Sequence, residues 1–178
     1  MGKARRFTFL GLSLALIALV LDQAVKFAVE GSMQLGQSIE VIPGIFHIHY
    51  ILNPGAAFSF GENFTVVFTL LQAAVAVFVI YLLLRRVQSR AWGIALGCLL
   101  GGVLGNLGDR LFREPSFGLG HVVDMLSVSH FAIFNVADSF IVCSMIAIAI
   151  MLIRGLNLDG TMGQQDKDET SAAGDRQE

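Results

Sequence analysis

Four apolar runs alternate with polar segments along this chain of 178 residues. The runs cover residues 7–29, 64–84, 91–109 and 131–153. Each is close to the roughly 20 residues that an α-helix needs to cross the hydrocarbon layer of a bilayer. A membrane β-barrel would instead show segments of about ten residues with alternating polarity, which are absent. The pattern predicts an all-α integral membrane protein with four transmembrane helices.

The basic residues indicate how these helices are oriented. They precede the first run, fill the turn between the second and third runs and follow the fourth: Lys3, Arg5, Arg6, Arg85, Arg86, Arg90 and Arg154. Because Lys and Arg near helix ends are retained on the cytoplasmic side, we expect both termini to be cytoplasmic. Residues 30–63 and 110–130 then form two segments on the opposite, outer side.

Composition bounds the domain organisation. The chain is 54% hydrophobic and only 15% charged, which suits one membrane domain over residues 1–158. The remaining segment, residues 159–178, lacks aromatic residues and is predicted to be a disordered cytoplasmic tail. The basic start and apolar first run could also be a cleaved signal peptide, but no small-x-small cleavage site closes the run, so a retained helix is favoured.

Two further patterns predict local structure. Residues 45–52 are rich in β-branched and aromatic residues and are followed by Asn53, Pro54 and Gly55, which predicts an outer strand ending in a turn. The third run carries glycines at four-residue steps: Gly93, Gly97, Gly101 and Gly105. Small residues at this spacing let helices approach closely in lipid, so this stripe is predicted to be a packing face.

Polar residues cluster at the outer ends of the predicted helices. Four carboxylates lie there with several neutral and basic partners: Asp22, Asp109, Asp124 and Asp138, with Gln23, Lys26, Asn106, Arg110 and Asn135. A charged residue at the bilayer centre costs roughly 2.5–3.5 kcal/mol, so ionisable groups kept in apolar segments mark functional sites. Their common level predicts one polar pocket at the outer membrane surface.

The four carboxylates differ in their neighbours along the chain. Asp22 can pair with Lys26 one turn on, and Asp109 lies beside Arg110, so these two acids are predicted to be structural. Asp124 and Asp138 have no adjacent cation. If they approach each other, one keeps its proton while the other ionises. Such a pair can activate a water molecule and protonate a leaving amine.

Other chemistries have weaker support in the sequence. Serines and histidines near Asp124 could supply a hydroxyl nucleophile and its base, yet no Gly-x-Ser-x-Gly elbow is present: Ser127, Ser129, Ser139, His121 and His130. His47 and His49 could face one side of a strand, but no HExxH or CxxC motif accompanies them, and we expect no metal or other cofactor. An ion-coupled transporter or channel subunit is the main alternative from another class, although its titratable groups should span the full membrane thickness. A purely structural subunit would explain the glycines but not two unpaired acids.

Five short strings, in order, resemble the bacterial lipoprotein signal peptidase (signal peptidase II) family. They read LDQAVK at residues 21–26, NPGAAF at 53–58, GNLGDR at 105–110, VVDML at 122–126 and FNVADS at 134–139. The resemblance spans roughly residues 7–153. It implies an intramembrane aspartic endopeptidase that cleaves diacylglyceryl-modified prolipoproteins on the amino side of the lipidated cysteine. It also implies a small extracytoplasmic β-cradle with a lid helix, placed between the third and fourth helices or in the NPGAAF region.

The same resemblance implies roles for individual residues. Asp124 and Asp138 correspond to the catalytic pair. The residues expected to line or support the site are Asn53, Gly55, Asn106, Asp109, Arg110, Asn135, Asp22 and Lys26. The expected setting is the bacterial inner membrane, with the active site at the outer leaflet. Membrane lipid and the prolipoprotein are expected partners, with no nucleic acid, cyclic peptide antibiotics of the globomycin type are expected inhibitors, and a monomer is expected.

Overall fold

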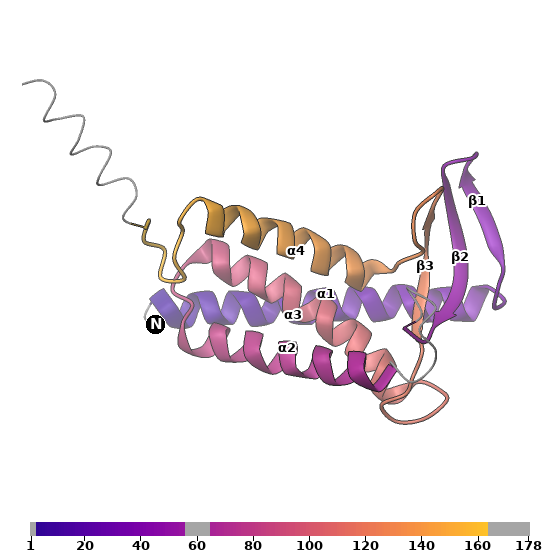
Figure 1. The fold of residues 1–178 in the computed structure, drawn as a ribbon, viewed down its shortest axis with the longest axis horizontal. Helices are drawn as coiled ribbons and strands as arrows, with labels where there is room; N and C mark the ends of the chain where they lie inside the picture. Colours follow the sequence, from indigo (N-terminus) through magenta and orange to yellow (C-terminus); the bar gives the residue numbers. More distant parts are fainter. Residues whose placement is uncertain (1–2, 56–64, 164–178) are drawn as a thin grey trace, which may run out of the picture.

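Four long helices form the body of the protein. The structure is a computed structural model, and it describes residues 3–55 and 65–163. The helices are α1 (Lys3–Ser32), α2 (Thr65–Arg85), α3 (Arg90–Phe112) and α4 (Val136–Ile153). Each is long and apolar enough to cross a membrane. They lie side by side, and α1 extends past the others at the end away from the N-terminus (Figure 1). The predicted four-helix membrane architecture is confirmed.

The third helix is the centre of the bundle. In its most apolar window 72% of the residues are buried, against 17–22% in the other three helices. The glycine stripe is the reason, because a side chain at Gly97 would run into the backbone of Gly11 on α1. At Gly101 the atoms of Ala15 and Ala18 lie equally close. The predicted packing face is therefore the contact between α1 and α3.

A small antiparallel sheet lies at the end of the bundle away from the N-terminus, which we call the sheet end (Figure 1). It consists of β1 (Ser38–Ile42), β2 (Phe46–Asn53) and β3 (Val122–Val128) in that order. Strand β2 is the strand predicted from the sequence. Its partner β3 carries Asp124 opposite Ile51. Val29 at the end of α1 packs with Tyr50, Val123 and Met125, which fixes the sheet to the bundle.

The structure corrects the predicted start of the fourth helix. Residues 131–135 are not helical, and α4 begins at Val136. The backbone of Phe134 instead exchanges hydrogen bonds with that of Leu126 beside β3. Asn135 then caps the helix, with extended backbone angles and its side-chain oxygen accepting from the N–H of Asp138. Asn135 therefore lies just before the helix and Asp138 in its first turn, and neither lies in the middle of a longer helix.

The lid helix was expected in one of the two outer segments. The described parts of the outer segments, residues 33–55 and 113–135, contain no helix. Residues 56–64, which include the end of the NPGAAF string and are the other place where the lid helix was expected, lie outside the described residues.

The disordered C-terminal tail was predicted to start at residue 159, which is too early. The N–H of Gly163 donates to the carbonyl of Gly155, and Asp159 accepts from the N–H of Thr161. Residues 164–178 lie outside the described part of the chain.

Candidate active site

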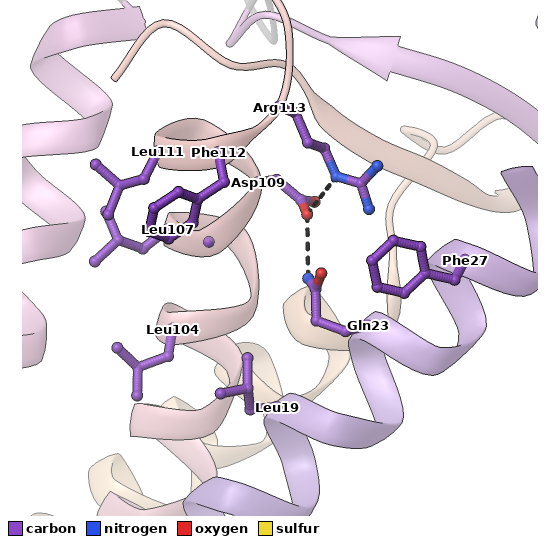
Figure 2. Close-up of a pocket in the computed structure, with 10 residues that line it drawn as sticks. Leu19, Gln23, Phe27, Leu104, Leu107, Asp109, Leu111, Phe112 and Arg113 are labelled. Carbon is purple, nitrogen blue, oxygen red and sulfur yellow. Dashed lines mark hydrogen bonds and ion pairs between the residues drawn. The ribbon is translucent and has the colours of Figure 1, made fainter. Parts of the chain in front are cut away.

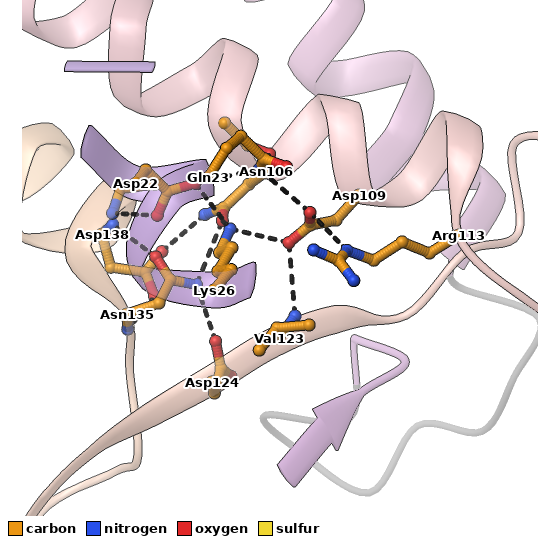
Figure 3. Close-up of polar contacts among 12 residues, drawn as sticks. Asp22, Gln23, Lys26, Asn106, Asp109, Arg113, Val123, Asp124, Asn135 and Asp138 are labelled. Carbon is orange, nitrogen blue, oxygen red and sulfur yellow. Dashed lines mark hydrogen bonds and ion pairs between the residues drawn. The ribbon is translucent and has the colours of Figure 1, made fainter. Parts of the chain in front are cut away.

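A buried polar network occupies the sheet end of the bundle. Six of the residues that the sequence singled out are at most 4% exposed there: Asp22, Lys26, Asn106, Asp109, Asp124 and Asn135. They come from α1, α3, β3 and the cap of α4, and their side chains converge (Figure 3). Buried ionised groups are tolerated only where partners replace water. The polar residues that the sequence predicted to lie together therefore do so, and their hydrogen bonds and ion pairs decide what each residue does.

Lys26 lies at the centre of this network. Its Nζ atom is 2.8 Å from Asp22 Oδ2 and 2.7 Å from Asp109 Oδ2. It also donates to Asn106 Oδ1 at 3.0 Å. The predicted pairing of Asp22 with Lys26 is present, and the structure adds Asp109 as a second acid on the same ammonium. The Lys26 ammonium thus joins α1 to α3 at the sheet end of the bundle.

Asp22 and Asp109 have further backbone partners. Asp22 Oδ1 accepts from the N–H of Ala137 in the first turn of α4 at 2.8 Å. Asp109 Oδ2 accepts from the N–H of Val123 in β3 at 3.3 Å. Each acid therefore fixes the backbone directly next to one member of the Asp124 and Asp138 pair. This supports the structural role predicted for both.

Asn135 links the two remaining carboxylates. Its Nδ2 atom donates to Asp124 Oδ1 at 2.7 Å and to Asn106 Oδ1 at 3.1 Å. Its backbone N–H donates to Asp138 Oδ2 at 3.1 Å, while its own Oδ1 accepts from the N–H of Asp138 at 2.9 Å. Asp138 is thus half of a capping box on α4. The two carboxylates that the sequence left without cations are joined through one asparagine.

Each carboxylate of this pair also receives a second amide. Asn106 Nδ2 donates to Asp138 Oδ1 at 2.7 Å, and Asn53 Nδ2 donates to Asp124 Oδ2 at 2.8 Å. Asp124 is 2% exposed. This burial and, to a smaller extent, the nearby charge of Asp138 raise the pKa of Asp124 to about 6, against the opposing effect of the hydrogen bonds from Asn53 and Asn135. Asp124 can therefore exchange its proton near neutral pH.

The turn after β2 holds Asn53 in place. Gly55 has φ of +106°, a conformation that favours glycine, and its N–H donates to Asn53 Oδ1 at 2.8 Å. Arg110 lies next to this turn, with Nη1 3.5 Å from the carbonyl oxygen of Pro54 and its guanidinium 5.5 Å from the ring centre of Phe68 on α2. Its Nε atom is buried and has no hydrogen-bond partner among residues 3–55 and 65–163. Arg110 therefore keeps a donor available at the site, whereas the sequence had suggested it as a neighbour for Asp109.

Comparison with known proteins identifies the family. The model of the family described as signal peptidase (SPase) II matches residues 14–154. This chain belongs to the signal peptidase II family.

Relatives from several actinobacteria agree. A protein of Streptomyces coelicolor called lipoprotein signal peptidase is 49% identical over 150 residues, which are 84% of this chain and 73% of the relative. Another of the same name, from Leifsonia xyli, is 44% identical over 89% of this chain and 74% of its own length. A third, from Mycobacterium tuberculosis, is 39% identical over 88% and 77%. Membership supports a bacterial multi-pass membrane protease that removes signal peptides from prolipoproteins.

Solved structures show the same fold. A bacterial membrane enzyme solved by the in meso method at 2.3 Å resolution superposes with a TM-score of 0.71 and 28% identity, covering 80% of this chain and 87% of that one. A second, at 1.9 Å resolution, gives a TM-score of 0.72 over 81% and 92% of the two chains. The arrangement of four helices and a small sheet is therefore shared with a known membrane enzyme.

The signal peptidase II network also extends beyond the residues that were predicted to line or support the site. Arg113 Nε donates to Asp109 Oδ1 at 2.7 Å, and Gln23 Nε2 donates to the same oxygen at 3.1 Å. Arg113 is also bonded to Glu30 at the end of α1. The four-residue spacing from Asp109 to Arg113 was a usable signal. The pairing with Glu30 joins residues far apart in the sequence and left no such signal.

An apolar groove lies behind these residues, between α1 and α3. Its volume is about 620 Å³, and Gln23, Asp109 and Arg113 form its polar side. Figure 2 shows Phe27 and Phe112 flanking this polar group, with the bonds from Asp109 to Gln23 and Arg113. The groove gives this face of the peptidase a largely apolar lining where two membrane-spanning helices meet.

The serine and histidine alternatives gain nothing from the geometry. Ser139 donates to the carbonyl of Asn135 and Ser129 to that of Gly44. In the described part of the chain neither hydroxyl bonds to a histidine. His47 faces Glu40 of β1, with Nε2 3.5 Å from Oε1, on the partly exposed sheet. The carboxylate pair remains the group best arranged for chemistry.

Proposed function

We propose that this chain is an intramembrane aspartic endopeptidase that removes the signal peptide from diacylglyceryl-modified prolipoproteins, cleaving on the amino side of the lipidated cysteine. The observation that carries this proposal is the bridge made by Asn135 between Asp124 and Asp138. The bridge lies at one end of four apolar helices and within an otherwise structural ion network. The signal peptidase II assignment and the names of the relatives agree with this substrate class.

The proposed reaction needs one proton shared by the two carboxylates. The ionised carboxylate removes a proton from a water molecule, and the water oxygen attacks the carbonyl carbon of the scissile amide. The protonated carboxylate donates a hydrogen bond to the carbonyl oxygen as negative charge develops there. The intermediate collapses when the amide nitrogen takes a proton and leaves. The pKa of about 6 at Asp124 brings the gain and loss of its proton close to neutral pH, as a carboxylate that exchanges a proton with water requires.

The neutral amides prepare the pair for this exchange. Asn53 and Asn135 hold both oxygens of Asp124, while Asn106 and the backbone of Asn135 hold Asp138. Fixed donors of this kind need no reorganisation during the reaction. Arg110 has a buried donor with no partner among the described residues, beside the turn that carries Asn53, so we assign it to the developing oxyanion or to the lipid head group.

We place the site at the outer leaflet. The basic residues Arg85, Arg86 and Arg90 lie between α2 and α3, at the end of the bundle opposite to the sheet. The positive-inside tendency then puts both termini in the cytoplasm and the sheet outside. A signal-peptide helix and acyl chains can reach such a site through the bilayer, while water reaches it from the outer surface. We also propose that the monomer is active.

Cleavage of a diacylglyceryl-modified prolipoprotein by the purified protein in detergent tests this function. We expect the parent to cleave it, and Asp124→Asn and Asp138→Asn each to lose at least about a thousandfold in rate. Asp159→Asn is the matched control, because Asp159 is exposed at the opposite end and accepts hydrogen bonds from Thr161. The thermal unfolding temperatures of all variants must be compared with that of the parent. This check is needed because the asparagine amide places an N–H donor at a position where the aspartate oxygen now accepts a hydrogen bond.

Two outcomes would contradict the proposal. Full activity in either aspartate variant would remove the two-carboxylate mechanism. Cleavage of the unmodified precursor at the same rate would rule out the lipid requirement.

Cyclic peptides of the globomycin type are expected to inhibit in competition with the prolipoprotein, and light scattering should report one chain per micelle. If this protein cleaves nothing under conditions where a related peptidase is active, the transporter alternative is favoured, and ion-flux assays test it.

A further inference from the structure

We propose that Arg113 is a positioning residue for the carboxylate pair, because it holds Asp109, which in turn holds both Lys26 and the strand that carries Asp124. The inference rests on the proposed peptidase function. Arg113 touches neither carboxylate of the pair in the structure. It is the C-cap residue of α3, and nothing in the family resemblance assigned it a role.

Arg113 is fixed by three groups on two helices. Its Nε atom donates to Asp109 Oδ1 at 2.7 Å, and its Nη1 atom is bonded to Glu30 Oε1. Its guanidinium lies 5.4 Å from the ring centre of Phe27 on α1. Its side chain is 17% exposed. A planar guanidinium can meet two carboxylates at once, whereas an ammonium acts as a point charge. Arg113 therefore clamps the end of α3 to the end of α1.

The opposite oxygen of Asp109 carries the effect toward the site. Asp109 Oδ2 accepts from Lys26 Nζ at 2.7 Å and from the N–H of Val123 at 3.3 Å. Val123 directly precedes Asp124 in β3. Lys26 donates a hydrogen bond to Asn106, and Asn106 donates one to Asp138. One carboxylate held by Arg113 thus sets the position of both members of the pair, by separate routes (Figure 3).

Charge balance strengthens this link. The chain of contacts Asp22, Lys26, Asp109, Arg113 and Glu30 holds three acids and two cations. Without Arg113, Lys26 is the one cation left in this chain of contacts for Asp22 and Asp109, and Glu30 loses its partner in it. We expect Asp109 then to draw Lys26 away from Asn106, and the added negative charge to raise the pKa of Asp124. The other charged groups near Asp124 are Asp138 from α4 and Arg110 from α3, and they are unchanged.

The test compares Arg113→Gln and Arg113→Lys with Arg154→Gln. Arg154 is the matched control because it is also a C-cap residue, on α4 at the opposite end. We expect Arg113→Gln to lower kcat about 10–100-fold with KM within about twofold, since a displacement of about 1 Å suffices for such a loss. The pH profile of kcat/KM should move to more alkaline pH. Arg113→Lys should keep the profile near that of the parent while kcat still falls, because the charge remains and the fork is lost.

Hydrogen exchange of the Val123 amide gives a readout that does not need activity. We expect Arg113→Gln to accelerate this exchange at least about tenfold, and Arg154→Gln to leave it unchanged, because the N–H loses a firmly held acceptor. If the parent cleaves no substrate, the proposed function fails while the exchange rate still decides whether Arg113 holds β3.

Three results would overturn the positioning role. The first is unchanged kcat and unchanged Val123 exchange in Arg113→Gln. The second is a raised KM at constant kcat, which would make Arg113 a substrate-binding group. The third is an equal loss in Arg154→Gln, which would make the effect a general one of removing a helix-end cation. If Arg113→Gln does not fold, Arg113→Lys carries the kcat and exchange comparisons alone.

Discussion

The ammonium of Lys26 lies 3.0 Å from Asn106 Oδ1, and this contact determines which end of the Asn106 amide faces Asp138. Because the ammonium can only donate, it keeps the oxygen of Asn106 on its own side. The Nδ2 group of Asn106 then points to Asp138 Oδ1 at 2.7 Å. A buried cation thereby orients a neutral donor at the proposed catalytic pair without touching it.

Replacing Lys26 by methionine should destabilise the protein strongly. Lys26→Met leaves the buried carboxylates of Asp22 and Asp109 without their shared cation, which typically costs about 3–5 kcal/mol. We expect the midpoint of thermal unfolding, followed by Trp92 fluorescence in detergent, to fall by roughly 10 °C. The double variant Lys26→Met/Asp22→Asn should recover part of this loss, because it contains one buried charge fewer. No recovery would mean that the packing of the Lys26 chain, and not charge, matters.

Asn135 should show separate effects on stability and rate. Asn135→Ser keeps a good N-cap on α4 but removes the amide donor to Asp124 and Asn106. We expect its unfolding free energy within about 1 kcal/mol of the parent and its kcat at least tenfold lower. Asn135→Ala should lose a further 0.5–2 kcal/mol or so with the cap. Parent-like cleavage by Asn135→Ser would show that the amide bridge is not needed.

The hydrogen bond from Asn53 predicts a change in pH dependence. It favours the ionised form of Asp124, so without it the pKa of Asp124 should rise above its value of about 6. In Asn53→Ala the limb of the kcat/KM profile on which Asp124 titrates should therefore move to more alkaline pH, by about one unit. Asn157→Ala, at the opposite end, is the control and should leave the profile in place. A shift toward acid would contradict the assigned direction.

Two glycines on α3 make a matched pair for testing the contact with α1. A Cβ at Gly97 would collide with backbone atoms of Gly11, whereas a Cβ at Gly108 meets nothing within 4 Å. Gly97→Ala should therefore push α1 away, lower the unfolding temperature and reduce cleavage, because α1 carries Lys26. Gly108→Ala should be neutral or stabilising by up to about 1 kcal/mol, since alanine favours helix. Equal unfolding temperatures in the two variants would argue against the close contact.

The sequence predicted those features that depend on neighbours along the chain. The four membrane helices, the strand at β2 and the ion pair of Asp22 with Lys26 are all visible as local periodicity or four-residue spacing. The gathering of polar groups at one depth also follows from where the helices end. The glycine stripe predicted a packing face but not which helix would fill it.

Other features depend on contacts between distant segments and left no local signal. The second acid on Lys26 is 83 residues away, and Glu30 is equally far from Arg113. Residues 131–135 continue an apolar run, so the sequence extended α4 over them, although pairing of Phe134 with Leu126 and the cap at Asn135 end the helix there. The pairing of β3 with β2 likewise joins two segments that are separated along the chain by α2 and α3.

The capping box has a consequence for biosynthesis. Asp138 acquires its partners only when α4 forms and its first turn meets Asp22, Asn106 and Asn135. A ribosome-bound chain that has inserted only three helices holds Asp124 but lacks its counterpart. In the proposed two-carboxylate mechanism, hydrolysis therefore becomes possible only after the last membrane helix has been inserted.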